Sequence, residues 1–158
     1  MVGDMKTAKP TGAPPERALL GVDQLLCFAL YSTGLAMDRV YRKLLRPLGL
    51  TYPQYLVVVV LSETDGIIVT ELGERLFLDS ATLTPLLKRL EHHGLIERRR
   101  EAEDERRVRI SLTAKGRALK DKVASVQLAI FHATQCSADQ MTSIKKQLDQ
   151  LRSKLRAG

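Results

Sequence analysis

The sequence predicts a mainly α-helical fold that carries one small β-hairpin. Most of the chain repeats its apolar residues three or four positions apart, which is the period of a helix with one buried face. Only the stretch 95–112 changes to the two-residue period of strands. A hydrophobic fraction of 44% supplies a core, and a charged fraction of 27% without Trp is typical of a helical globular chain.

Start and stop signals divide the chain into predicted helices. Ser, Thr and Asp favour the position before a helix, and Gly or Pro ends one. We therefore expect helices over 21–46, 51–62, 71–76, 80–93, 113–134 and 137–155. The expected caps are Thr51, Thr70, Asp79 or Ser80, Thr113 and Ser137, and the expected C-terminal signals are Pro47 to Gly49 and Gly94.

Pro85 conflicts with the pattern of the fourth helix. A proline inside a helix removes one hydrogen bond and kinks the axis. Local rules would instead begin the helix at Thr84, with Pro85 in the first position. We therefore expect an irregular first turn between Asp79 and Pro85.

Residues 95–100 can pair with residues 107–112 in a β-hairpin. Val108, Ile110 and Leu112 alternate with polar residues, and 101–106 forms a polar tip. The span 97–109 holds six arginines against five acids, so its net charge is nearly balanced.

The order helix, turn, helix and then hairpin, over residues 50–113, is the layout of a winged helix-turn-helix. The fourth helix has a leucine stripe at 83, 86, 87 and 90 and an opposite face that is small, polar and basic, which suits the DNA major groove. A formal charge of +7 and a pI of about 9.6 also favour a polyanion partner. An ordinary amphipathic surface helix remains the alternative for this element alone.

Candidate DNA contacts follow from this layout. A hairpin tip is narrow enough to place one arginine in a minor groove, and Asp104 could pair with an arginine and fix its aim. For Arg98 to Arg100 the alternative is a solvated strand end. The candidates are Ser80, Thr82, Thr84, Lys88 and Arg89 on the helix and Asp104, Arg106 and Arg107 on the hairpin.

Three segments, 82–91, 93–96 and 104–113, closely resemble the MarR family of regulators. The resemblance extends over about 20–155 and is specific in 72–116. It implies a homodimer whose interface is formed by the N- and C-terminal helices, and a palindromic operator in double-stranded DNA. It also implies DNA contacts by the recognition helix around Ser80 to Arg89, without deciding between bases and phosphates, and a minor-groove role for Arg106. We expect a disordered arm over 1–16 and a single domain over 17–158, with dimerisation helices in 17–47 and 114–158.

The chain has two cysteines, Cys27 and Cys136, and no CxxC pair, so neither a zinc ribbon nor a thioredoxin-like site is indicated. Cys27 precedes Tyr31 by one helical turn, and all four tyrosines fall between residues 31 and 55. A phenol O–H can donate to a thiolate, and a helix N-terminus favours negative charge, so both features favour the nucleophilic thiolate. The alternative is that Cys27 is a packing residue among leucines.

Cys27, Tyr31, Tyr41 and Tyr52 resemble the peroxide-sensing set of the organic hydroperoxide resistance regulators, a branch of that family. The resemblance implies that Cys27 reacts with the peroxide and that Tyr41 and Tyr52 of the partner subunit hold its thiolate. It further implies a two-cysteine subtype. Cys27 becomes a sulfenic acid, Cys136 of the other subunit resolves it as a disulfide, and the operator is released. Apolar neighbours favour bulky organic hydroperoxides; they are Leu25, Leu26, Phe28, Leu56 and Val57.

Two other functions fit parts of the sequence. One is a repressor released by a small phenolic or aromatic ligand without cysteine chemistry. The other is a thiol peroxidase, which leaves the hairpin unexplained. We expect no enzyme, no cofactor and no metal site, since His92 and His93 point apart on a helix. We also expect a cytoplasmic protein without a secretion signal, because no apolar run approaches the roughly 18–20 residues that span a bilayer.

Overall fold

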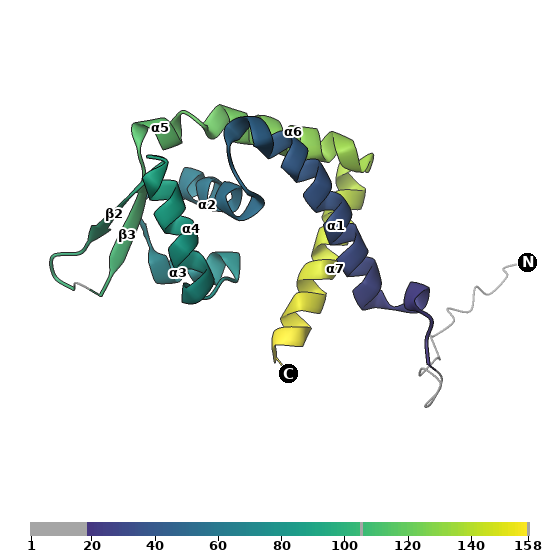
Figure 1. Cartoon of the computed structure of the whole chain (residues 1–158). Helices are drawn as coiled ribbons and strands as arrows, with labels where there is room; N and C mark the ends of the chain where they lie inside the picture. The colour runs from purple at the N-terminus through teal and green to yellow at the C-terminus, as the bar shows by residue number, and fades with distance from the viewer. Residues whose placement is uncertain (1–18, 105, 158) are drawn as a thin grey trace, which may run out of the picture. The chain divides into compact units, whose positions relative to one another are not determined.

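The computed structural model describes residues 19–104 and 106–157 of the chain (Figure 1). The described residues fall into two compact units, one that ends at Ala36 and one that begins at Met37. The described part of the first unit holds a 3-10 turn, η1 (Val22–Gln24), and the start of helix α1 (Leu26–Leu45), which continues into the second unit. Leu25 has extended backbone angles, so α1 begins later than the predicted residue 21.

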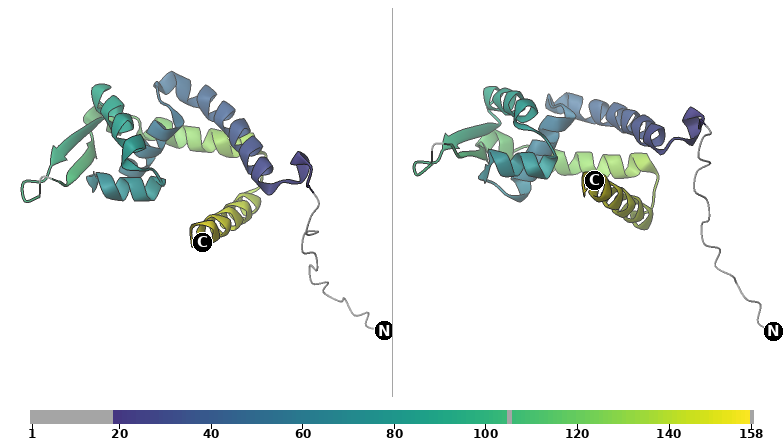
Figure 2. Two further views of the ribbon diagram at one scale, coloured as in Figure 1. Left: turned by 60° about the horizontal axis from the view of Figure 1, so that its bottom comes forward. Right: turned by 90° about the horizontal axis from the view of Figure 1, so that it is seen from below.

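The second unit contains the remaining elements, most of which match the predicted ones. Its three strands form one antiparallel sheet in the order β1-β3-β2, and Arg98 lies opposite Ile110 in the hairpin. Figure 2 shows this hairpin projecting past the helices of the unit. The elements are η2 (Arg46–Leu48), α2 (Tyr52–Glu63), β1 (Ile67–Ile68), α3 (Val69–Leu76), α4 (Ser80–His92), β2 (Ile96–Arg100), β3 (Val108–Leu112), α5 (Ala114–Arg117), α6 (Lys120–Thr134) and α7 (Ala138–Ala157).

Most of the expected caps are confirmed. The Thr113 hydroxyl accepts from the Gly116 N–H at 3.0 Å, and Ser137 and Gln140 exchange the two bonds of a capping box at 3.2 and 2.9 Å. Thr51 forms the same motif at the start of α2. Gly94 has a φ of 69°, as a residue just beyond a helix C-terminus requires.

Three local predictions are wrong. Thr70 is not a cap, because α3 begins at Val69, after an Ile68 that makes no capping bond. The short strand β1 was not anticipated, since two residues are too few to show a period. The predicted helix 113–134 is divided into α5 and α6, although Ala118 and Leu119 at the break keep right-handed helical angles.

The irregular first turn expected before Pro85 is also wrong. Helix α4 is continuous from Ser80, and the Asp79 carboxylate caps it by accepting from the Thr82 N–H at 2.7 Å. The missing N–H of Pro85 leaves the carbonyl of Ala81 without its helical donor. Ala81 is exposed, so water can bond that carbonyl and the helix tolerates the proline.

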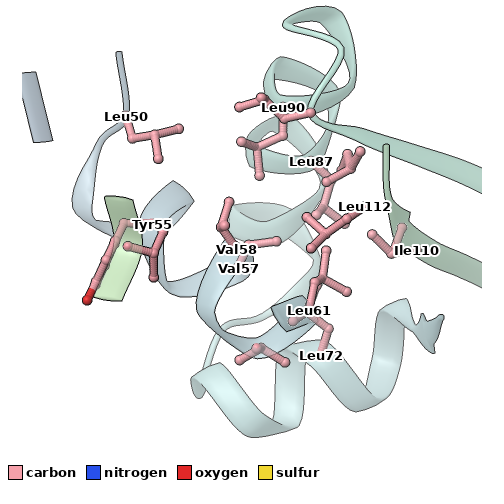
Figure 3. Close-up of a cluster of buried hydrophobic side chains, with 14 of the residues drawn as sticks. Leu50, Tyr55, Val57, Val58, Leu61, Leu72, Leu87, Leu90, Ile110 and Leu112 are labelled. Carbon is pink, nitrogen blue, oxygen red and sulfur yellow. The ribbon is translucent and has the colours of Figure 1, made fainter. Parts of the chain in front are cut away.

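The core lies where α2, α4, the hairpin and α6 meet. The leucine stripe of α4 is confirmed, because Leu83, Leu87 and Leu90 are fully buried and Leu86 is partly buried. Figure 3 shows Leu87 and Leu90 beside Val57 and Val58 of α2, with Ile110 and Leu112 of β3 next to them. This packing fixes which face of α4 is left to solvent.

Among the described residues, no single helix is both long and apolar enough to cross a bilayer. A bent pair, Leu26–Leu48 with Tyr52–Glu63, passes on length and composition when its members are taken together.

Gly116 tests the packing between α5 and the end of α4. A Cβ on Gly116 would overlap the carbonyl oxygen of Leu95 and lie 3.1 Å from a methyl group of Leu112. Gly116→Ala should therefore lower the free energy of unfolding by about 1–3 kcal/mol. Gly34→Ala is the matched control, because nothing lies within 4 Å of its added Cβ; it should gain about 0.5–1 kcal/mol from helix propensity. Urea unfolding measures both, and equal stabilities would contradict the packing.

Candidate functional site

Helix α4 presents the candidate DNA-reading residues on its solvent face. Because the leucine stripe is buried, the side opposite it is exposed. Among the described residues, neither Lys88 nor Arg89 forms an ion pair. The exposed candidates are Ser80, Thr82, Thr84, Lys88 and Arg89.

The hairpin tip is shaped by Asp104. Its carboxylate accepts from the backbone N–H of Arg106 at 3.0 Å, and its carbonyl accepts from the Arg107 N–H at 2.9 Å. Asp104 therefore orders the backbone of the turn, and no ion pair joins it to an arginine among the described residues. The Arg106 side chain is exposed, and it too has no ion pair within the described part of the chain.

Glu101 binds the other arginines near the tip. Its carboxylate pairs with Arg107 at 3.3 Å and also with Arg109, whose guanidinium donates to the carbonyl of Gly66 as well. Arg107 is thus partly held within the hairpin, whereas Arg106 is available to a partner.

An ion pair also joins the hairpin to α4, the helix that carries the candidate DNA-reading residues and is called the reading helix below. The Arg98 guanidinium donates to Glu91 of α4 through Nε at 2.8 Å and Nη2 at 2.6 Å. Arg98 is therefore a structural link rather than a solvated strand end, while Arg99 pairs with Glu97 of the same strand. Sequence reasoning missed Glu91 and Glu101, because their partners are six to eight residues away across a turn.

The two cysteines lie in different units, and both are free thiols. Cys27 is exposed and is the second residue of α1, so it lies at the positive end of that helix. Tyr31 follows one turn later on the same side of the helix and is 63% exposed. Cys136 is half-buried between α6 and α7, directly after Gln135, whose φ of 54° is left-handed.

Three tyrosines form a cluster in the second unit. The ring centroids of Tyr41 and Tyr52 are 4.4 Å apart, and Tyr55 lies 5.6 and 6.1 Å from them. Burial raises the pKa of all three phenols, most strongly that of Tyr41. Tyr41 also donates a hydrogen bond to Tyr52. These hydroxyls therefore stay protonated near neutral pH and can serve as donors.

Tyr55 was not among the predicted site residues. It is 2% exposed and accepts a hydrogen bond from Gln127 of α6, so it forms the buried side of the cluster. Its position three residues after Tyr52, on the same side of α2, was the available signal. Val57, expected near the thiol, is instead fully buried in the core, whereas Leu25, Leu26 and Phe28 are exposed.

These features define a class of protein. A helix-turn-helix with an exposed, polar and basic second helix, followed by a hairpin with an exposed arginine at its tip, is a winged DNA-binding unit.

Comparisons with known proteins agree with this class. The family model described as "Transcriptional regulator SarA/Rot" matches residues 39–123. The HTH-type transcriptional regulator TtmR of Methylorubrum extorquens (strain PA1) is 48% identical over 136 residues, covering 86% of this chain and 70% of that protein. The organic hydroperoxide resistance transcriptional regulator of Bacillus subtilis (strain 168) is 43% identical over 127 residues, covering 80% of this chain and 86% of that protein.

A solved structure shows the same fold on DNA. Reduced AbfR bound to DNA aligns with a TM-score of 0.70 and 35% identity, over 82% of this chain and 90% of that one. AbfR, from Staphylococcus epidermidis, has also been solved overoxidised on DNA and with its disulfide formed.

The chain belongs to the MarR family of winged helix-turn-helix transcription regulators, and the organic hydroperoxide resistance regulators are among its relatives. It is a DNA-binding transcription regulator. These relatives are regulators rather than enzymes, which argues against the thiol peroxidase alternative.

Arg106→Ala tests the role of the hairpin tip. Loss of a minor-groove arginine should weaken binding to the DNA upstream of the chain's own gene by about 1–3 kcal/mol, or roughly 5- to 150-fold. Gel shifts at fixed salt measure the affinity, and circular dichroism should show an intact fold. Lys154→Ala on α7 removes the same charge and is the control. Equal DNA affinities for Arg106→Ala and Lys154→Ala would show that Arg106 has no specific role in DNA binding.

The tyrosine cluster predicts a specific loss of stability in alkali. A phenol whose pKa is raised in the folded state stabilises the fold below the unfolded pKa of 10.0, and that contribution is lost as pH rises above it. Tyr41→Phe should therefore flatten the decline in unfolding free energy between about pH 10 and 11. Urea unfolding of both reduced proteins gives the two slopes, and parallel slopes would be inconsistent with the burial of Tyr41.

Proposed function

We propose that this regulator is a repressor that senses organic hydroperoxides through Cys27 and then releases its operator. The observation that best supports this proposal is the cluster of Tyr41, Tyr52 and Tyr55, whose hydroxyls are protonated and can donate hydrogen bonds. An exposed cysteine at a helix N-terminus supplies the nucleophile. The organic hydroperoxide regulator of B. subtilis and the reduced and disulfide forms of AbfR support this chemistry.

The first step is a two-electron oxidation of sulfur. The Cys27 thiolate attacks the terminal oxygen of the hydroperoxide ROOH, an S–O bond forms and the O–O bond breaks. Cys27 becomes a sulfenic acid, and the alkoxide leaves as the alcohol ROH after taking up a proton. Tyr41 and Tyr52 of the partner subunit hold the thiolate by donating to it. A cytoplasmic setting suits this step, because thiols stay reduced there.

The second step forms a disulfide between subunits. The thiolate of Cys136 attacks the Cys27 sulfenic sulfur, an S–S bond forms, and hydroxide leaves and is protonated to water. A disulfide needs Cα atoms within about 7 Å of each other. Bond formation therefore selects a dimer state with its own spacing of the reading helices, which lowers affinity for a palindromic operator in double-stranded DNA. A dithiol reductant reverses the step.

Exposed apolar side chains on the terminal helices support the homodimer. Such residues usually face solvent only until a partner covers them. They occur on α1 and on α7, the two helices that we expect to form the interface. On α1 they are Leu26, Phe28, Leu30 and Leu35, and on α7 they are Ile144, Leu148 and Leu155.

Cumene hydroperoxide is the probe that tests the mechanism. The reduced wild type should bind the DNA upstream of its gene and lose it after treatment, because Cys27 is oxidised. Cys27→Ser should bind equally well before treatment and show no response to it. Cys136→Ser should form the sulfenic acid but no intersubunit disulfide, as non-reducing mass spectrometry can show.

Two outcomes would overturn the proposal. Release of DNA by peroxide in Cys27→Ser would place the sensor elsewhere. Release of the untreated protein by a phenolic compound such as salicylate, without any response to peroxide, would support the ligand-gated alternative.

A further inference from the structure

Phe77 is an exposed aromatic residue in the turn of the helix-turn-helix. It follows the last residue of α3, and its φ of 56° lies in the left-handed region that favours Gly or Asn. Its side chain is 55% exposed, so burial does not explain why a large ring occupies this strained position.

Two arginines of α7 contact this ring. The guanidinium carbons of Arg152 and Arg156 each lie 4.7 Å from the ring centroid, which is cation–π distance. The two residues are four apart and share one side of α7. The same three side chains line a cleft of about 780 Å³ together with residues at the start of α4, including Ser80 and Leu83. The stack is the contact between α7 and the turn before the recognition helix.

The charges around the stack favour this geometry. Asp149 accepts from Arg152 at 2.5 Å and also from Lys145, so one guanidinium is already oriented. The hydrogen bonds from these two cations keep the pKa of Asp149 below its usual value, so its carboxylate remains ionised. Arg156 forms no ion pair within the described residues, and the ring is its close partner.

Helix α7 connects this contact to a cysteine. It spans Ala138–Ala157, about 30 Å at 1.5 Å per residue, and Cys136 lies just before its first turn. The capping box of Ser137 and Gln140 ties that segment to the helix. A displacement at Cys136 is therefore carried along a rigid element to Arg152 and Arg156 near its other end.

We propose that the stack of Arg152 and Arg156 on Phe77 is a latch through which α7 holds the whole helix-turn-helix in its DNA-binding position. Movement of Cys136 during disulfide formation opens the latch. The first statement rests on the observed contacts and on the DNA-binding class of the protein, and the second rests on the proposed function.

The latch is tested first in the reduced protein. Phe77→Leu, and the double variant Arg152→Gln with Arg156→Gln, should each weaken binding to the upstream DNA about 5- to 30-fold, the range that two exposed cation–π contacts supply. Phe77→Tyr keeps the ring and should bind like the wild type. The triple variant that combines Phe77→Leu with Arg152→Gln and Arg156→Gln should bind DNA no more weakly than Phe77→Leu alone. Additive losses would show that the arginines bind DNA directly and would overturn the latch.

Phe77→Gly separates the latch from folding. Glycine relieves the left-handed strain, so this variant should be at least as stable as Phe77→Leu in urea and yet bind DNA equally weakly. Recovery of DNA affinity in Phe77→Gly would mean that strain, and not the lost ring, weakens binding, and it would overturn the proposal.

The redox half needs a separate comparison. The disulfide-bonded wild type should bind DNA more weakly than the reduced wild type. In Phe77→Leu the latch is already open, so the ratio of the reduced to the disulfide-bonded affinity should be at least threefold smaller than in the wild type. An unchanged ratio would overturn the redox coupling. The same latch variants made in a Cys27→Ser background should show the same losses of DNA affinity without peroxide, so failure of the sensing mechanism leaves the test of the latch intact.

Discussion

The burial of the leucine stripe of α4 is the constraint on which the rest of the structure depends. Leu83, Leu87 and Leu90 are each 1% exposed or less, and full burial of one leucine contributes about 1.5–3 kcal/mol. A rotation of the helix would expose them, so the opposite face is fixed toward solvent. That face holds the hydroxyl and basic side chains proposed to read DNA. The orientation of the reading surface is thus a consequence of core packing.

Ion pairs position the hairpin relative to α4, whereas core packing sets the orientation of α4 itself. The ion pair between Arg98 and Glu91 joins the hairpin to α4, and Glu101 holds Arg107 and Arg109 near the hairpin tip. Because the acids are used in this way, a hairpin with nearly balanced charge still offers Arg106 to a partner. Arg98, Arg107 and Arg109 therefore stabilise the hairpin, whereas Arg106 is exposed to a partner such as DNA.

The proposed sensor uses a different kind of environment. Cys27 is exposed, as a thiol that meets a peroxide must be, while Tyr41, Tyr52 and Tyr55 are clustered and burial raises the pKa of each phenol above its ordinary value. The thiol and the phenols lie in separate units of one chain. An assembly of two chains with hydroxyls of one subunit at the thiol of the other would make the site dependent on the dimer.

The sequence by itself determined the features that depend on residues within about four positions of each other. These include the caps at Thr51, Asp79 and Thr113, the leucine stripe, the hairpin and the motif resemblance to the family. Tertiary structure decided which arginines are engaged, the burial of Tyr55 and the stack on Phe77. Each of these depends on partners brought close by folding, such as Arg109 and Gly66, which are 43 residues apart. Rules based on neighbouring residues in the sequence cannot predict such partners, because the energy of an ion pair or a buried ring depends on residues that only the folded chain brings close.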